Sequence, residues 1–295
     1  MRITLRQLDI FRAIALTGST SAAAQSVPLS QSAASTALGE LEHNLNALLF
    51  DRVGKRLLLN DNGRALLPMA LAVLDGARNV EMAFASSDHG LTVDLRLFAS
   101  TTLGNYILPK LLSQFRQLVP TAKLDVRIGN TLDVVTAVNE FSADLGFIEG
   151  PCHEPDIRII PWFEDELIIV AAPTHSLAKA KLTIKQLRQA PWLLREPGSG
   201  TREAVELALL PYLQNIQPAM TLGSSEAIKN LVAEGLGVSC LSRAVVHDLL
   251  SAGRLSVLNT ALPHLLRRTS IIHHRSKLLS EPLQKFMRHC ESYRG

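Results

Sequence analysis

The residues that decide the fold are GSTSAAAQSVPLSQSAASTALGELEHNL, at positions 18–45. Gly18 can end a preceding helix in the left-handed conformation, and Ser19 or Thr20 can cap the next helix. Pro28 then interrupts the chain, because proline cannot continue a helix interior. Ser30 can cap a third helix over residues 31–45. Two short helices, a tight turn and a longer third helix together predict a helix-turn-helix.

The third helix has two unlike faces. Ala34, Leu38, Leu41 and Leu45 recur at helical spacing and predict a buried stripe. The opposite face carries small polar side chains near its N-terminus, where a recognition helix contacts base edges. Glutamine can pair with adenine, and serine or threonine can pair with several bases. The predicted DNA contacts of this region are Thr20, Ser30, Gln31, Ser32, Ser35 and Thr36.

The segment FDRVGKRLLL at 50–59 follows the helices and predicts a wing of two short strands turning at Gly54. Arg52, Lys55 and Arg56 crowd this wing with positive charge suited to phosphate groups. An alternative interpretation is an ordinary three-helix packing unit with a solvated polar face. A winged helix-turn-helix is favoured by the combination of all these features.

Residues 61–87 form one long helical pattern. Leu67, Ala70, Leu74, Ala77 and Phe84 follow a three-four spacing that suits contact with a second helix, whereas the alternative is a helix lying on its own domain. Pro68 is expected to kink the first half of this helix. The polar stretch at 86–90, which ends in glycine, is the expected domain boundary.

From about residue 92, apolar strand-like runs alternate with amphipathic stretches, which predicts βαβ units around a parallel sheet. Open sheets of this kind bind ligands beyond the carboxyl ends of their strands. Hydroxyl groups and glycines recur there, at helix N-termini that favour an anion. Simple N-capping uses the same residue types and is the alternative at each position. The candidate ligand contacts at these strand ends are Ser100, Thr101, Thr102, Asn130, Glu149, Arg195, Ser199 and Thr201.

The composition excludes several classes of protein. Of 295 residues, 47% are hydrophobic, which argues against disorder, and the formal net charge of +3 confines any DNA contact to a local cluster. Three cysteines, Cys152, Cys240 and Cys290, do not make a disulfide framework or a metal knuckle, so no metal site is expected. The N-terminus lacks the apolar core of a signal peptide, and no run reaches membrane-spanning length. We therefore expect a soluble cytoplasmic protein that does not bind membranes.

Taken in order, the motifs resemble the signature of LysR-type transcriptional regulators. They are GST with AAA at 18–24, LSQSAAS at 29–35, Leu41-Glu42, and LFDR at 49–52. Two positions depart from the pattern: Asn46 replaces the usual glycine after the recognition helix, and Asn60 replaces the usual threonine before the next helix. Asparagine tolerates the left-handed conformation and is an equally good N-cap, so both turns are expected to survive.

The resemblance covers essentially the whole chain and implies three parts. These are an all-α winged helix-turn-helix domain at 1–60, a linker helix for dimerisation at 61–90, and an α/β effector domain at 91–295. The effector domain is expected to have two Rossmann-like lobes, as in type 2 periplasmic binding proteins. Lobe I would comprise about 91–162 and 268–295, and lobe II about 163–267, with the ligand between them. The implied partners are double-stranded DNA, a second copy in a homodimer or homotetramer, and RNA polymerase if the protein activates transcription; no cofactor is implied.

The expected effector is a small oxyanion. The loops after the strands contain many hydroxyl groups, few cations and no aromatic residue, which disfavours flat aromatic ligands. The segments GNYILP at 104–109, GFIEGPCH at 146–153 and REPGSGTR at 195–202 most resemble the YeiE and CysL branch of the family, which is linked to sulfur metabolism. That resemblance implies sulfite or a related anion. Glu149 and Glu196 would repel a dianion, but bisulfite could donate a hydrogen bond to Glu149.

Two other functions stay open at this point. A redox-sensing regulator could use Cys152, which ends a strand near the cleft, although an inert thiol is the commoner case. An enzyme on a binding-protein fold is remote, because Cys152-His153 has no third partner and Gly198-Ser199-Gly200 is too short for a nucleophile elbow. His273-His274 lies on an expected strand, where neighbours face opposite ways and cannot jointly bind a metal. No catalytic residue is therefore predicted.

Overall fold

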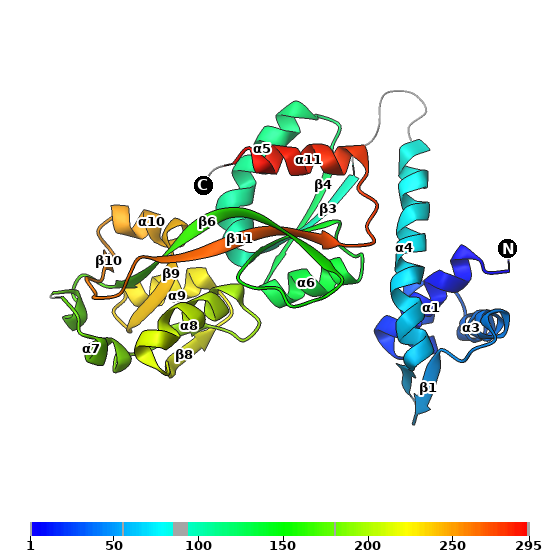
Figure 1. The fold of residues 1–295 in the computed structure, drawn as a ribbon, viewed down its shortest axis with the longest axis horizontal. Helices are drawn as coiled ribbons and strands as arrows, with labels where there is room; N and C mark the ends of the chain where they lie inside the picture. Colours follow the sequence, from blue (N-terminus) through cyan, green and yellow to red (C-terminus); the bar gives the residue numbers. More distant parts are fainter. Residues whose placement is uncertain (1, 55, 85–93, 180, 294–295) are drawn as a thin grey trace. The chain divides into compact units, whose positions relative to one another are not determined.

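A computed structural model describes residues 2–54, 56–84, 94–179 and 181–293 (Figure 1). The chain divides into two compact units. One comprises residues 1–92 with 276–280, and the other comprises 93–275 with 281–295. Lys55 and the expected boundary at 86–90 lie outside the described residues.

The first unit has three helices, a two-stranded wing and a long helix. These are α1 (Leu5–Thr17), α2 (Thr20–Ser26), α3 (Gln31–Leu45), β1 (Phe50–Val53), β2 (Arg56–Leu59) and α4 (Asp61–Phe84). The predicted caps are confirmed: the side chains of Ser19 and Ser30 accept hydrogen bonds from Ala22 and Ala33. Gly18 adopts the left-handed conformation with φ 67°.

A single apolar core holds the three short helices and the wing together. Phe11, Ile14 and Leu41 are fully buried, and the rings of Phe11 and Phe50 lie 5.5 Å apart. Asn46 ends α3 at φ 51°, as the left-handed turn requires, and the Asn60 side chain accepts from the Gly63 amide at 3.0 Å. Both asparagine substitutions therefore preserve the turns expected of glycine and threonine. The helix α4 is continuous through Pro68.

The second unit is built on one nine-stranded sheet with the order β4-β3-β5-β11-β6-β9-β7-β8, and β10 pairs with β6. Its strands are β3 (Asp94–Ser100), β4 (Lys123–Gly129), β5 (Leu145–Glu149), β6 (Ile157–Ala171), β7 (Trp192–Arg195), β8 (Pro218–Leu222), β9 (Val238–Ser242), β10 (Ser256–Val257) and β11 (Leu265–His274). Helices α5 (Leu108–Leu118), α6 (Thr131–Asn139), α7 (Ile184–Arg188), α8 (Gly200–Leu213), α9 (Ser225–Ala233), α10 (Arg243–Ser251) and α11 (Glu281–Glu291) cover it, with two short turns, η1 (Leu103–Ile107) and η2 (Ser176–Ala178).

The long strands β6 and β11 cross between two halves of this sheet (Figure 1). We call the half with β3, β4, β5, α5, α6 and α11 the first lobe, and the half with β7, β8, β9 and helices α7 to α10 the second lobe. The second lobe has its own core around Trp192, Leu209 and Val238. The first lobe packs Val134 and Ile148 beneath α6.

The expectation of a parallel sheet is wrong for the middle of the domain. Strands β3, β4 and β5 are parallel, and so are β7, β8 and β9, but β11 pairs antiparallel with both β5 and β6. The reason is topological: a chain that enters the second lobe on β6 and returns on β11 must run in the opposite direction. The helix α5 begins at Leu108, directly after the turn η1, and Pro109 occupies its first turn.

Candidate nucleic-acid interface and effector cleft

The polar face of α3 is exposed, as the sequence predicts. Gln31, Ser32, Ser35 and Thr36 are all exposed, whereas Ala34, Leu38 and Leu41 are buried. The Gln31 amide lies 3.4 Å from the hydroxyl of Thr20, which is partly exposed at the start of α2. The Ser30 and Ser32 hydroxyls lie 3.0 Å apart. The predicted base-reading residues therefore form one continuous polar surface on α2 and α3.

The wing adds exposed positive charge beside this surface. Arg52 and Arg56 are exposed on β1 and β2, which pair in antiparallel register. The Leu57 amide donates to the Gly18 carbonyl at 2.9 Å and so anchors the wing to the turn between α1 and α2. Arg64, which the sequence reasoning did not select, is engaged by Asp61 and the Leu59 carbonyl. Arg52 and Arg56 therefore have the exposure that contact with phosphate groups would require.

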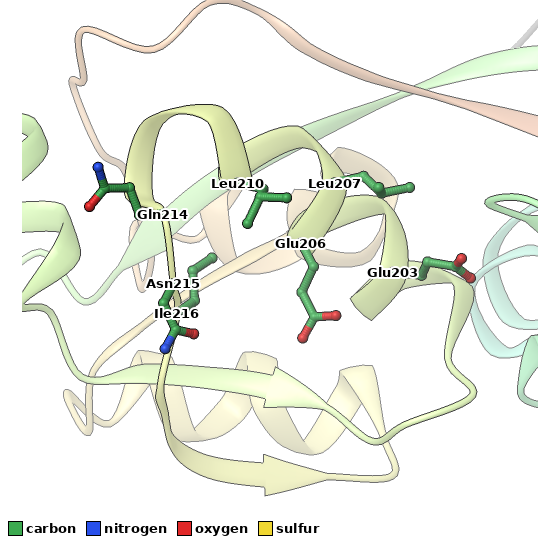
Figure 2. Close-up of a pocket in the computed structure, with 7 residues that line it drawn as sticks. All are labelled: Glu203, Glu206, Leu207, Leu210, Gln214, Asn215 and Ile216. Carbon is green, nitrogen blue, oxygen red and sulfur yellow. The ribbon is translucent and has the colours of Figure 1, made fainter.

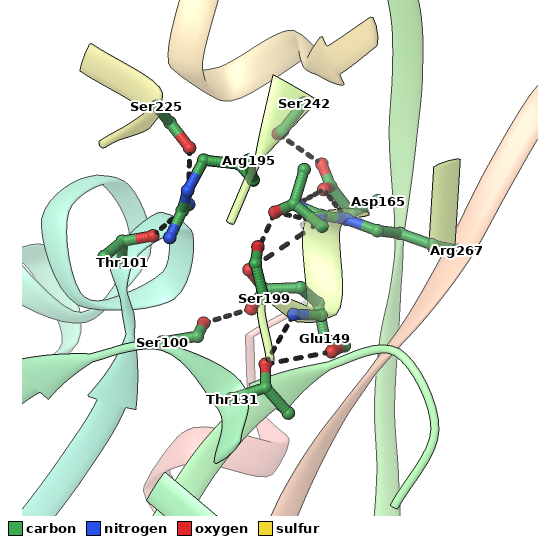
Figure 3. A network of polar contacts seen from close by, with 12 residues as sticks. Ser100, Thr101, Thr131, Glu149, Asp165, Arg195, Ser199, Ser225, Ser242 and Arg267 are labelled. Atoms are coloured by element: carbon green, nitrogen blue, oxygen red, sulfur yellow. Dashed lines mark hydrogen bonds and ion pairs between the residues drawn. The ribbon is translucent and has the colours of Figure 1, made fainter. Parts of the chain in front are cut away.

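A buried carboxylate lies in a network of polar contacts where the two lobes meet, at the place where the sequence predicts the effector cleft (Figure 3). Glu149 ends β5 and is 1% exposed. Its Oε2 accepts a hydrogen bond from the Ser100 hydroxyl of β3, and its Oε1 accepts one from the Thr201 hydroxyl of α8 at 3.1 Å. Because Ser100 belongs to the first lobe and Thr201 to the second, this one side chain joins both lobes.

Arg267 extends the network from the crossing strand β11. Its Nη1 donates to the Thr201 hydroxyl at 2.8 Å and lies 3.7 Å from Glu149 Oε1. Its Nε donates to Asp165 Oδ2 at 2.7 Å, and Asp165 Oδ1 accepts from the Ser242 hydroxyl at 2.8 Å. Burial of so many charged groups is tolerated because each is paired and hydrogen-bonded.

Arg195 forms a second bridge at the end of β7. Its Nη1 donates to the Thr101 hydroxyl of the first lobe at 2.7 Å and to the Ser225 hydroxyl of the second at 2.8 Å. The other side of the guanidinium holds Glu196 through two hydrogen bonds. Partial burial opposes ionisation of Glu196, but the hydrogen bonds and charge of Arg195 outweigh it and lower the pKa of Glu196. Any anion entering here must therefore compete with Glu196 for Arg195.

The backbones of the two lobes also meet directly. The Gly200 amide donates to the Thr131 hydroxyl at 3.2 Å, and the Leu132 amide donates to the Gly198 carbonyl at 3.1 Å. A β-carbon at position 200 would stand 1.8 Å from the Glu149 carbonyl oxygen. The glycine at the start of α8 is thus what allows this close approach.

The structure brings most of the predicted effector residues together in buried polar contacts between the two lobes. Ser100, Glu149 and Thr201 share one network, and Thr101 joins Arg195. The side chains of two others cap helices: Asn130 caps α6 and Ser199 caps α8.

Thr102 is 1% exposed, and its hydroxyl has no hydrogen-bond partner in the described part of the chain. It is therefore the predicted effector residue whose polar group the surrounding protein leaves unsatisfied.

Sequence reasoning missed several members of the cleft: Thr131, Asp165, Arg267, Ser225 and Tyr106. Asp165 and Arg267 stand opposite each other on the crossing strands, and no strand-end signal marks them.

Tyr106, from η1, donates a hydrogen bond to Glu226 at the start of α9. Glu226 lies 2.7 Å from Lys229, whose side chain is 2% exposed and also pairs with Asp248 at 2.9 Å. Burial and the Glu226 carboxylate both raise the pKa of Tyr106, so its hydroxyl stays a donor.

Burial acts on the thiols of the three cysteines. Cys152 is partly buried, and burial raises its pKa, while burial raises the pKa of Cys240 to about 12. His153 lies 3.5 Å from Glu203 and is exposed. Within the described ranges, no group of three or more His, Cys, Asp or Glu side chains could hold a metal ion. None of the helices among those residues is long and apolar enough to cross a membrane.

Two cavities lie beside α8, outside the cleft. One of about 310 Å³ lies between α8 and the segment leading to β8, lined by Glu206, Leu210 and Asn215 among others (Figure 2). The other, of about 530 Å³, is lined by α8, the crossing strands and the loop after β5. We call this second one the hinge cavity.

Comparison with known proteins identifies the class of this chain. Residues 5–64 match the family described as "Bacterial regulatory helix-turn-helix protein, lysR family", and residues 89–294 match the "LysR substrate binding domain". The chain therefore belongs to the LysR family, and it is a DNA-binding transcriptional regulator with an effector-binding domain rather than an enzyme.

Among its relatives is the uncharacterized HTH-type transcriptional regulator YeiE of Escherichia coli K12. It is 50% identical over 291 residues, which cover 99% of this chain and 98% of YeiE. The resemblance to YeiE expected from the sequence motifs is thus confirmed.

Two solved structures share the fold. A full-length single-residue variant of OxyR from Pseudomonas aeruginosa has a TM-score of 0.70 and 25% identity, covering 99% of this chain and 94% of that one. The regulatory domain of CcmR from Synechocystis, solved in complex with 2-PG, has a TM-score of 0.60 and 30% identity. The match covers 68% of this chain and 96% of the CcmR domain.

Proposed function

We propose that this regulator binds a small oxyanion such as sulfite in the cleft between its two lobes, and that this ligand modulates sequence-specific DNA binding. DNA binding would use Gln31 and the neighbouring polar residues of α3 for base reading, and the wing arginines for phosphates. The protein would act in the cytoplasm as a homodimer or homotetramer, contacting RNA polymerase where it activates.

The observation that carries the proposal is the buried network around Glu149, which holds both lobes through Ser100 and Thr201. A ligand placed there would meet side chains from both lobes at once. The unpartnered hydroxyl of Thr102 offers a further hydrogen bond. The helices α6, α8 and α9 begin at Thr131, Gly200 and Ser225, and the positive ends of their dipoles would favour negative charge.

The carboxylate of Glu149 restricts which anion fits. Because Glu149 accepts hydrogen bonds, a fully ionised dianion beside it would be repelled, whereas a protonated monoanion could donate to it. Bisulfite satisfies this condition. Its negative charge would lie toward Arg195, which the ligand would share with Glu196. The CcmR regulatory domain solved with 2-PG is a precedent for a small ligand in a related domain.

The mechanism would be linkage between two arrangements of the lobes. A ligand that contacts both lobes stabilises the arrangement in which those contacts coexist, and it shifts the equilibrium only by its difference in affinity for the two arrangements. DNA affinity then changes by the same factor by which DNA changes ligand affinity.

The test is calorimetric titration of the full chain with sulfite, sulfate and thiosulfate. We expect saturable heat with sulfite, and a loss of at least about tenfold in affinity for Thr201→Val, which removes one hydroxyl from the network. Thr136→Val is the matched control, because Thr136 is exposed on α6 away from the network. Absence of heat with all three anions would remove the oxyanion proposal.

A mobility-shift assay on DNA upstream of the gene, with and without sulfite, tests the second half of the proposal. We expect sulfite to shift the protein concentration needed for half-saturation of DNA. If the protein concentration at half-saturation of DNA is the same with and without a bound anion, the anion binds without regulating DNA binding, and the linkage is contradicted.

A further inference from the structure

The hinge cavity lies back to back with the Glu149 network. Gly150, which lines it, directly follows Glu149 in the chain, and Arg268 directly follows Arg267. Ala204 and Ala208 line the cavity from the helix whose first turn carries Thr201. The loop after β5, the strand β11 and the helix α8 therefore contribute residues to both the network and the cavity lining, and Arg267 belongs to both.

The walls of this cavity are mainly apolar. Leu207 and Ala208 contribute from α8, Ile159 and Pro161 from β6, and Leu266 from β11. Leu207 is 57% exposed, so a ligand in the cavity could cover its side chain. A volume of about 530 Å³ lies within the range of small-molecule sites.

Arg268 is the exposed charged residue of the cavity lining, which also includes the buried Arg267 and Ser270. Along β11, Leu266 and Arg268 alternate with the buried Arg267, so their side chains face away from the cleft network. Arg268 is exposed and stands opposite Glu164 in the strand register. Among the described residues, the ion pairs of this region engage Arg267 with Glu149 and Asp165 and leave the Arg268 guanidinium available to a ligand.

We propose that the hinge cavity is a second binding site, which takes a small monocarboxylic acid with a compact hydrocarbon body. The carboxylate would bind the Arg268 guanidinium, which suits bidentate pairing, and the hydrocarbon would cover Leu207, Ile159 and Leu266. Neutral apolar molecules lack the partner for Arg268, and inorganic anions lack the apolar part. Because β11 and α8 serve both sites, the acid changes DNA binding as well.

The first test is a ligand-observed NMR titration of the full chain with hexanoate as the probe and hexanamide as its neutral analogue. We expect saturation with a Kd of about 1 mM or tighter, within what a ligand of this size can reach. Arg268→Ala should weaken hexanoate by about tenfold, the equivalent of a lost charge-assisted pair. Arg158→Ala is the matched control, since Arg158 is an exposed arginine on β6 outside the cavity lining.

A pair of variants on α8 tests the apolar wall without disturbing the core. Leu207→Glu places a carboxylate in the cavity and should weaken hexanoate, whereas Leu210→Glu, at a residue 55% exposed that lines the other cavity, should not. Light scattering on both variants reports the oligomeric state. The proposal is overturned if hexanoate does not saturate, if Arg268→Ala and Arg158→Ala bind alike, or if Leu207→Glu changes the oligomer, which would assign this face to a subunit contact.

Coupling to DNA is measured separately. Hexanoate should shift the half-saturating protein concentration on DNA in the wild-type chain and not in Arg268→Ala. An unchanged DNA titration with hexanoate bound overturns the regulatory part. The outcome is independent of the oxyanion proposal, because hexanoate should still bind Thr201→Val, whose altered side chain lies in the cleft.

Discussion

The Thr131 hydroxyl accepts a hydrogen bond from the Gly200 amide at 3.2 Å, although the two residues belong to different lobes of the effector domain. The same hydroxyl donates to the Glu149 carbonyl at 3.3 Å. Both contacts depend on a main chain without a side chain at position 200. The lobes are therefore held by backbone proximity as well as by the charged network beside it.

Gly200→Ala should consequently be severely destabilising. The added β-carbon would stand 1.8 Å from the Glu149 carbonyl oxygen, so either the lobes separate or the start of α8 shifts. We expect a loss of about 3 kcal/mol or more in the free energy of unfolding, measured by urea denaturation. Gly223→Ala is the control, because a β-carbon there meets nothing within 4 Å. Equal stability of the two variants would show that the close approach does not exist.

Gln31→Ala should relax the choice of DNA sequence. Gln31 is exposed at the start of α3, where it can pair with a base edge, so its loss should cost about 1–3 kcal/mol at one base position. Binding-site selection from a random DNA library measures this directly. Gln117→Ala, at an exposed position on α5, is the control. Operator preference that survives Gln31→Ala would disprove the assignment of α3 as the recognition helix.

Arg52→Ala should weaken DNA binding without changing sequence preference. An exposed wing arginine that contacts a phosphate contributes to counterion release, so the slope of log affinity against log salt should fall by about one. Mobility-shift titrations at several salt concentrations give the slope. An unchanged slope would place Arg52 away from the DNA.

Tyr106→Phe should favour separation of the lobes. The Tyr106 hydroxyl donates to Glu226 of the other lobe, and because this contact is exposed to solvent we expect it to contribute about 1 kcal/mol. We expect weaker binding of the cleft ligand, with sulfite as the probe, and a larger radius of gyration in solution scattering. Tyr212→Phe is the control, because Tyr212 lies on α8 away from this contact. If the two variants behave alike, the Tyr106 bond does not hold the lobes together.

Cys152→Ser should leave the response to ligand unchanged. Burial raises the pKa of the Cys152 thiol, so less thiolate is present at neutral pH than in a free cysteine, and reaction with peroxide or iodoacetamide should be slow. Mass spectrometry after timed exposure to iodoacetamide measures the rate. Rapid modification, together with a loss of DNA regulation in the serine variant, would restore the redox hypothesis.

The sequence predicts the elements of the DNA-binding unit closely, because local signals decide them. The caps at Ser19 and Ser30 and the left-handed turns at Gly18 and Asn46 each depend on one residue type in one place. The cleft is predicted only in part. Ser100, Glu149 and Thr201 follow strands or begin helices, so the end of each strand marks them.

Arg267 and Asp165 could not be found in the same way. They lie in the middle of two long strands that pair antiparallel, and their partnership depends on a register between residues about a hundred positions apart. Tyr106 was not predicted from the sequence for a similar reason, because its partner Glu226 belongs to the other lobe. Local patterns predict where a strand ends, but not which distant residues the crossing strands bring together.

The two crossing strands have a consequence for how such proteins diversify. The whole second lobe is an insertion: the chain departs on β6, builds the lobe, and comes back on β11, while β3 and α11 at either end stay with the first lobe. An inserted lobe that is joined to the rest of the chain by two paired strands can be exchanged without changing the connections of the other elements. The preference for a ligand could then be exchanged between regulators while the DNA-binding domain is kept.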